Sequence, residues 1–173
     1  MKPVEIIKMT ISTLHDVYHD QLQDLYSACK QSLDVTNDLA KAAQNEDLTK
    51  ALVAGAQGIS DGMEKIAQLC NDHDINPDGE HCKGMEGLVK EARAHGLDEA
   101  IDDADARDAM IITQYQRMTH YAIAGYGCLR AFANRLDLDG DGAVLTECLD
   151  AAYEGDRSMT EIATGQVNRA AAA

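Results

Sequence analysis

Four acidic side chains in the C-terminal third of the chain have the types and spacing that could bind a calcium ion. They are Asp137, Asp139, Asp141 and Glu147. Residues 137–144 carry acids at the first, third and fifth positions and Gly142 at the sixth, which is the order of an EF-hand loop. The twelfth position, where such a loop has a bidentate glutamate, is Cys148, and the glutamate comes one residue early. The alternative is a turn whose acids cap the helix that follows.

Two cysteines and two histidines around one expected loop offer a second set of ligands, of the types that zinc prefers. They are Cys70, His73, His81 and Cys82. Adjacent residues of a helix point in different directions, so His81 and Cys82 are not expected to reach one ion together. The five cysteines are scattered and include no Cys-x-x-Cys pair. Reduced thiols, and therefore a cytoplasmic protein, are expected.

Helices must position these side chains, because apolar residues recur at alternating steps of four and three along most of the chain. One clear stretch contains Ile111, Tyr115, Met118 and Leu129. Two prolines, one Phe and no Trp argue against sheets. The chain is therefore predicted to be all-α, with one domain over residues 1–173. Long helices are expected at about residues 5–43, 46–73, 105–135 and 141–167, and a short helix at about 80–95.

Two stretches of the chain need an explanation. Gly55, Gly58 and Gly62 lie on one face of the second helix, and each costs about 0.8–1 kcal/mol relative to Ala in a helix interior. We expect the close approach of a neighbouring helix to offset this cost. The acidic residues in the range 98–108 are expected to form a solvated connector, with the last carboxylates near the N-terminal end of the third long helix.

The charge of the chain argues against two classes of partner. The 15 basic and 30 acidic residues give a formal net charge of −15, so phosphate backbones and anionic membrane surfaces should repel the protein. No apolar run approaches the roughly 20 residues that cross a bilayer. Neither a nucleic acid nor a membrane is therefore an expected partner.

Three short motifs can be compared with those of known families. Residues 82–92 read Cys-Lys-Gly-Met-Glu-Gly-Leu-Val-Lys-Glu-Ala, residues 119–129 read Thr-His-Tyr-Ala-Ile-Ala-Gly-Tyr-Gly-Cys-Leu, and residues 16–18 read Asp-Val-Tyr. They resemble motifs of the YciE/YciF family of ferritin-like bacterial stress proteins. The resemblance implies an antiparallel four-helix bundle with a short extra helix between the second and third long helices. It also implies a homodimer, and a di-iron or di-manganese centre held by carboxylates between the long helices.

Every acidic metal ligand that this resemblance implies is replaced by a neutral residue. The implied metal-site positions are Gln21, Gln57, Gly58, Gly62, Thr119, Ala122, Ala151 and Ala152. The family pattern has a glutamate at each of them except Gly62, where it has Gln or His. Highly charged ions in a dry core need anionic oxygen ligands. Only His120 and Asp156 remain in that neighbourhood, and two ligands on separate helices cannot hold two ions. The resemblance, with these changes, therefore implies a degenerate di-metal site without a cofactor.

The centre of the bundle is accordingly expected to be closed. Neutral residues fall on inward stripes of the long helices at Gln21, Gly62, Ala122 and Ala152. The side chains expected to fill the centre are Tyr18, Met63, Met118 and Tyr121. His120 is expected to be a core or boundary histidine that finds one hydrogen-bond partner.

Three functions are compatible with these observations. The first is a non-catalytic, stress-associated structural or interaction protein with a degenerate di-metal site. The second is a di-iron or di-manganese oxidoreductase or metal-binding protein with an unusual centre near His120, Asp156 and thiols. The third is a calcium-binding module that uses residues 137–147. No Ser-His-Asp order, phosphate-binding loop or acid/base pair stands out, so the first function is the prediction and no enzyme is expected.

Overall fold

The computed structural model describes residues 10–173, and every regular element within them is a helix. The long helices are α1 (Leu14–Ala42), α2 (Glu46–Asp72), α4 (Ala104–Arg135) and α5 (Asp139–Ile162). The shorter elements are α3 (Lys83–Ala92), α6 (Asn168–Ala171) and the π-helical turns η1 (Arg93–Asp98) and η2 (Ala163–Val167). The prediction of an all-α fold is therefore confirmed for this part of the chain.

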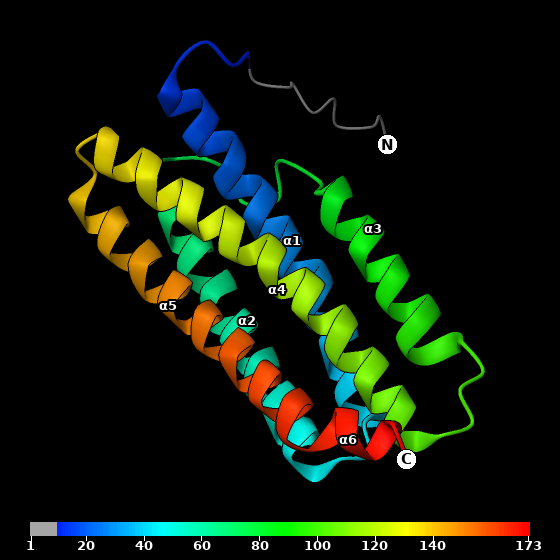
Figure 1. Cartoon of the computed structure of the whole chain (residues 1–173). Coiled ribbons are helices and arrows are strands. Elements are labelled where there is room, and N and C mark those ends of the chain that lie inside the picture. The colour runs from blue at the N-terminus through cyan, green and yellow to red at the C-terminus, as the bar shows by residue number, and fades with distance from the viewer. Residues whose placement is uncertain (1–9) are drawn as a thin grey trace, which may run out of the picture.

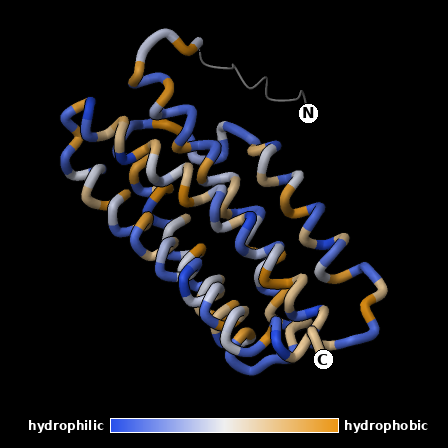
Figure 2. The backbone as a smooth tube through the Cα atoms, in the orientation of Figure 1, coloured by the Kyte–Doolittle hydropathy of each residue, from blue (hydrophilic) through white to orange (hydrophobic). Residues whose placement is uncertain are grey.

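The four long helices run side by side, and α3 lies along one flank of them (Figure 1). α1 packs along α2 and α4 packs along α5, whereas α2 and α5 touch each other less extensively. Figure 2 shows hydrophobic and hydrophilic residues alternating along each helix, as one buried face per helix requires. The largest fully buried side chains are Tyr18, Leu22, Leu25, Leu39, Leu48, Leu52, Ile66, Met85, Ile111, Leu129, Leu145 and Met159.

The first long helix begins later than its apolar pattern predicts. Thr13 is its N-cap: the Thr13 hydroxyl accepts a hydrogen bond from the Asp16 backbone N–H at 3.2 Å, and the Asp16 carboxylate accepts one from the Thr13 N–H at 2.8 Å. This capping box satisfies N–H groups that a helix leaves free at its start, so the helix begins at Leu14. The predicted start at residue 5 is therefore wrong for residues 10–13, and residues 5–9 lie outside the described residues.

Asp108, the last residue of the acidic stretch, is buried and not part of a solvated connector. Its side chain is fully buried, and its two oxygens accept the backbone N–H groups of Gln44 at 2.9 Å and Asn45 at 2.7 Å. Asp108 thereby ties the α1–α2 turn to the first turns of α4. The expectation of a solvated acidic connector is wrong for this residue, because two otherwise unpaired N–H groups compensate the burial of its charge.

Within residues 10–173, none of the helices combines the length and the apolar character needed to cross a membrane.

Candidate functional site

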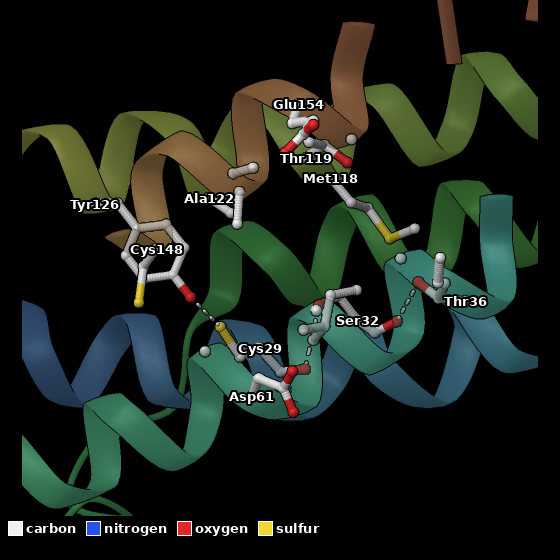
Figure 3. Close-up of a pocket in the computed structure, with 18 of the residues that line it drawn as sticks. Cys29, Ser32, Thr36, Asp61, Met118, Thr119, Ala122, Tyr126, Cys148 and Glu154 are labelled. Atoms are coloured by element: carbon white, nitrogen blue, oxygen red, sulfur yellow. Dashed lines mark hydrogen bonds between the residues drawn. The ribbon is translucent and has the colours of Figure 1, made fainter. Parts of the chain in front are cut away.

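A cavity of about 470 Å³ lies between the long helices. Side chains of all four long helices line it, together with Met85 of α3. In Figure 3 the labelled residues of α1 and α2 lie on the lower side of the cavity and those of α4 and α5 lie on the upper side. The walls contributed by α2 and α5 consist largely of small residues: Ala51, Ala54, Gly55, Gly58, Gly62, Ala151, Ala152 and Gly155. These small residues explain why α2 and α5 leave space between them.

Most of the positions that the family resemblance assigns to metal ligands surround this cavity. Six of the eight line it: Gly58, Gly62, Thr119, Ala122, Ala151 and Ala152. The other two do not line it. Gln57 donates to Asp61 on the exposed face of α2, and Gln21 is exposed and donates to Asp20. The expectation that Gln21 points inward is therefore wrong, because Leu22 occupies the buried position of that turn.

The expectation of a closed, filled centre is also wrong. Tyr18 and Tyr121 do not reach the cavity, because the Tyr18 hydroxyl donates to Asp141 at 2.7 Å and the Tyr121 hydroxyl donates to Asp24 at 2.9 Å. Met63 is half-buried and does not line the cavity, whereas Met118 does. Small residues thus leave a hollow where larger ones were expected to meet.

Two tyrosines of α4 reach toward glycines of α2 and partly fill the centre. A Cβ atom at Gly55 would lie 2.2 Å from the Tyr115 hydroxyl oxygen, and one at Gly62 would lie 2.4 Å from that of Tyr126. No atom lies within 4 Å of a Cβ placed at Gly58. The expected reason for these glycines, a close approach of helix backbones, is therefore replaced by another: two of them make room for tyrosine hydroxyls.

Three hydroxyl groups of the cavity lining use their protons within their own helices. The hydroxyls of Ser32, Thr36 and Thr119 donate to backbone carbonyls of their own helices, at 3.2, 2.7 and 3.0 Å respectively. The Cys29 thiol and the Tyr126 hydroxyl lie 3.5 Å apart. Burial raises the pKa of Cys29 to about 11 and raises the pKa of Tyr126 well above its ordinary value, so both groups are neutral at neutral pH.

These donor atoms do not fit a pair of iron or manganese ions. A thiol binds metal as the thiolate, which the raised pKa of Cys29 disfavours. The carboxylates that line the cavity are Asp61, Glu147 and Glu154, and Glu147 is paired with Lys65 at 2.9 Å. Across residues 10–173, no group of three or more His, Cys, Asp or Glu side chains is placed to hold a metal ion.

The four acids proposed as a calcium loop do not form a group of ligands around one point. α5 begins at Asp139, so Asp139 and Asp141 belong to its first turn. Asp141 accepts hydrogen bonds from Tyr18 and from His73, each at 2.7 Å, and Glu147 pairs with Lys65 of α2. Asp137 is exposed, with a left-handed backbone at φ 57°. Helical geometry therefore replaces the loop in which these acids would converge.

His120 and Asp156 lie on the outer side of α4 and α5 and do not line the central cavity. His120 Nε2 is 3.0 Å from Asp156 Oδ1, and the His120 side chain is 64% exposed. His120 therefore has the one partner that was expected, but the expected core or boundary position is wrong, because the side chain lies at the surface.

The cysteines and histidines considered for zinc separate in the same way. His73 binds Asp141, His81 lies 2.6 Å from Glu86, and Cys82 lies 2.9 Å from the Tyr121 hydroxyl. Cys70 is buried, and burial raises its pKa to about 11. The predicted failure of all four to converge agrees with these separate partners.

A cluster that the sequence analysis missed lies where α1 begins and α2 ends. The His19 and His73 rings are 5.0 Å apart, and His19 Nε2 is buried with no hydrogen-bond partner among the described residues. Desolvation, followed by the charges of His73 and His15, lowers the pKa of His19. The spacing of His15 and His19, four residues apart on one helix, was the available signal.

Comparisons with known proteins agree over nearly the whole chain. The family described as "Domain of unknown function (DUF892)" matches residues 13–172. Protein YciF of Escherichia coli (strain K12) is 32% identical over 164 residues, which cover 94% of this chain and 98% of that protein. The crystal structure of the E. coli stress protein YciF matches with a TM-score of 0.84 at 32% identity, over 91% of this chain and 99% of that one. YcfI of Rhodopseudomonas palustris, described as a proposed structural protein, matches with a TM-score of 0.82 at 28% identity, over 89% of this chain and 97% of that one.

Proposed function

The chain belongs to the DUF892 family, and from this premise we propose that it is a non-catalytic, stress-associated structural or interaction protein. In this proposal it is a single ferritin-like four-helix bundle whose di-metal site is degenerate. The names of the two relatives, a stress protein and a proposed structural protein, support the first half of the proposal.

One observation carries the second half. Six of the eight positions at which the resemblance implies metal ligands surround one cavity, and they are occupied there by glycine, alanine and threonine. None of these side chains supplies the anionic oxygen that a highly charged ion needs in a desolvated site. In this proposal the helical scaffold of the family is retained, whereas the metal-dependent chemistry is lost because the carboxylate ligands are absent.

Elemental analysis tests the proposal directly. Protein purified without a chelator or an affinity tag should contain iron and manganese far below one ion per chain. About two ions of either metal per chain would overturn the proposal and return the protein to the di-metal oxidoreductases, since two is the number that a ferritin-like centre holds. Calcium measured in the same sample tests Asp137, Asp139, Asp141 and Glu147, for which we expect no stoichiometric calcium.

The proposal includes a homodimer, by analogy with the family, and a cytoplasmic location, which the free cysteines favour. Light scattering during size-exclusion chromatography should give a mass of two chains, each of 18.7 kDa. The mass of one chain would remove the dimer from the proposal and leave the metal argument unchanged.

A further inference from the structure

We propose that the cavity between α2 and α5 binds a small organic ammonium ion, with an apolar body inside the cavity and the ammonium group at its mouth. This inference goes beyond the proposed function and rests on only one part of it, that the centre holds no metal. Such an ion matches the cavity in volume, in the hydrogen-bonding character of the lining and in the charges at the mouth.

The interior suits a compact apolar body. Its volume of about 470 Å³ lies within the roughly 300–1,000 Å³ of small-molecule pockets. Met85, Met118 and Tyr115 line it together with the small residues of α2 and α5. Water against such walls gains few hydrogen bonds, so an apolar molecule that displaces it is favoured.

Five side chains of the lining favour a ligand that donates hydrogen bonds. Ser32, Thr36 and Thr119 have committed their hydroxyl protons to backbone carbonyls, so each can offer a ligand only its lone pairs. Asp61 and Glu154 are carboxylates and also accept, and Asp61 already accepts one bond from Gln57 at 2.7 Å. The Tyr115 and Ser158 hydroxyls of the lining can donate as well as accept, so the two carboxylates decide the preference. A primary ammonium group carries three N–H donors and no acceptor, whereas an anionic ligand would be repelled by the charges of Asp61 and Glu154.

The charge at the mouth selects a cation. Asp61 of α2 and Glu154 of α5 line the cavity, and neither belongs to an ion pair within residues 10–173. The one basic residue of the lining, Lys65, is paired with Glu147 at 2.9 Å. Figure 3 shows Asp61 and Glu154 on different helices of the lining. An ammonium ion at the mouth is attracted by the charges of both carboxylates and keeps its contact with water, which avoids the cost of a buried charge.

Three probes with one aromatic body and different head groups test this selection. They are 2-phenylethylamine, which is a cation at neutral pH, 2-phenylethanol, which is neutral, and 3-phenylpropionate, which is an anion. In titration calorimetry at low salt, the amine should bind about tenfold more tightly than the alcohol, and the anion should not bind. Added salt should reduce the difference in binding affinity between the amine and the alcohol, because it screens the charge of the carboxylates. Equal binding of all three probes, or binding of none, would overturn the proposal.

Charge variants with matched controls locate the ammonium group. Asp61→Asn combined with Glu154→Gln should reduce the affinity for the amine to that for the alcohol. The control combines Asp72→Asn with Glu161→Gln, which changes the net charge equally on the same two helices, outside the cavity lining. Asp72 is a close match for Asp61, because each accepts a hydrogen bond at 2.7 Å from a glutamine four residues earlier. Equal losses in both double variants would show a general charge effect and overturn the assigned site.

A filling variant locates the apolar body. Gly58→Leu adds a side chain where a Cβ meets no atom within 4 Å, and it should abolish binding of both amine and alcohol. Gly127→Leu on α4 is the control, because a Cβ at Gly127 also meets no atom within 4 Å and Gly127 does not line the cavity. Ala151→Met gives a second filling variant if Gly58→Leu loses its helical circular dichroism. Retained binding in a folded filling variant would overturn the proposal.

Metal analysis of the same protein sample separates the two proposals. If the sample holds two iron or manganese ions per chain, the proposed function fails and the ligand site fails with it. If the sample is free of metal and the amine shows no preference, only the ligand proposal fails.

Discussion

Tyr115 and Tyr126 shape the central cavity, because their hydroxyls reach from α4 to glycines of α2. A buried tyrosine needs space for its ring and a partner for its hydroxyl. Tyr126 finds the Cys29 thiol at 3.5 Å, and Gly62 supplies the space. The role of each glycine can therefore be tested by a Gly→Ala substitution, whose effect on stability depends on the atoms that the added methyl group contacts.

Two glycine substitutions on the same helix should change stability in opposite directions. Gly58→Ala meets open space and should raise the free energy of unfolding by about 0.5–1 kcal/mol, because Ala restricts the unfolded chain more than Gly does. Gly62→Ala places a methyl 2.4 Å from the Tyr126 hydroxyl and should lower it by about 1–2 kcal/mol through overpacking. Urea unfolding followed by circular dichroism measures both.

The double variant checks the cause of the Gly62 effect. In a Tyr126→Phe background the nearest ring atom, Cζ, would lie 3.5 Å from the new methyl, so Gly62→Ala should become neutral or stabilising. If its cost is unchanged in that background, the tyrosine hydroxyl is not the reason for the glycine.

His19 should make the protein less stable as the pH falls. Its pKa is lowered in the folded state by desolvation, so below the ordinary pKa of 6.5 the unfolded chain binds more protons than the folded one. The contribution of neutral His19 to the free energy of unfolding is therefore fully present above pH 6.5 and is lost as the pH falls through the folded-state pKa. Urea unfolding at about pH 7.5 and about pH 5.5 should show a smaller loss for His19→Gln than for the unmodified protein. An equal loss in the two proteins would contradict this role of His19.

The helices are held in register by contacts at their ends as well as by their apolar faces. The Thr13 and Asp16 capping box fixes where α1 begins, and Asn45 caps α2 through the N–H of Leu48 at 3.0 Å. Asp108 joins the turn between these two helices to α4. None of these end contacts joins α2 to α5. The cavity lies along this pair, because most of the α2 and α5 residues that line it are small.

Removal of the Asp108 carboxylate should loosen the α1–α2 turn from α4. Asp108→Ala leaves the N–H groups of Gln44 and Asn45 without their acceptor in a buried place, which costs about 2–4 kcal/mol of unfolding free energy. Asp102→Ala, at an exposed position before α4, should change it by less than about 0.5 kcal/mol. Hydrogen exchange should also speed up at the Gln44 and Asn45 amides in the Asp108 variant. Equal stability of the two variants would contradict the role given to Asp108.

The whole molecule carries more negative charge than its ion pairs compensate. The formal net charge is −15, and most of the ion pairs that the structure contains involve exposed side chains, which contribute little individually. Mutual repulsion of the carboxylates therefore opposes folding and is long-ranged at low salt.

Added salt should therefore stabilise the protein. An increase of sodium chloride from about 0.01 M to about 0.15 M shortens the Debye length from about 30 Å to about 8 Å and screens this repulsion. The midpoint of thermal unfolding, followed by circular dichroism, should rise over that range. A falling midpoint would mean that the surface ion pairs stabilise the fold more than the repulsion destabilises it.

The sequence by itself determined the helices and their order, because apolar residues at helical spacing have a low-energy solution only when they share one face. It also located most positions of the central site, since Gly58, Gly62, Thr119, Ala122, Ala151 and Ala152 line one cavity. Only the tertiary structure decided what those residues enclose. A stripe of small residues is compatible with helices that close together or with helices that stay apart, and the sequence analysis expected closure. Tyr115 and Tyr126, whose hydroxyls lie against Gly55 and Gly62, stand between α4 and α2, so the long helices keep their spacing.

The tertiary structure also decided that Asp108 is buried and that Gln21 is exposed. Each outcome depends on which residue lies opposite the side chain, and that residue is distant in the sequence.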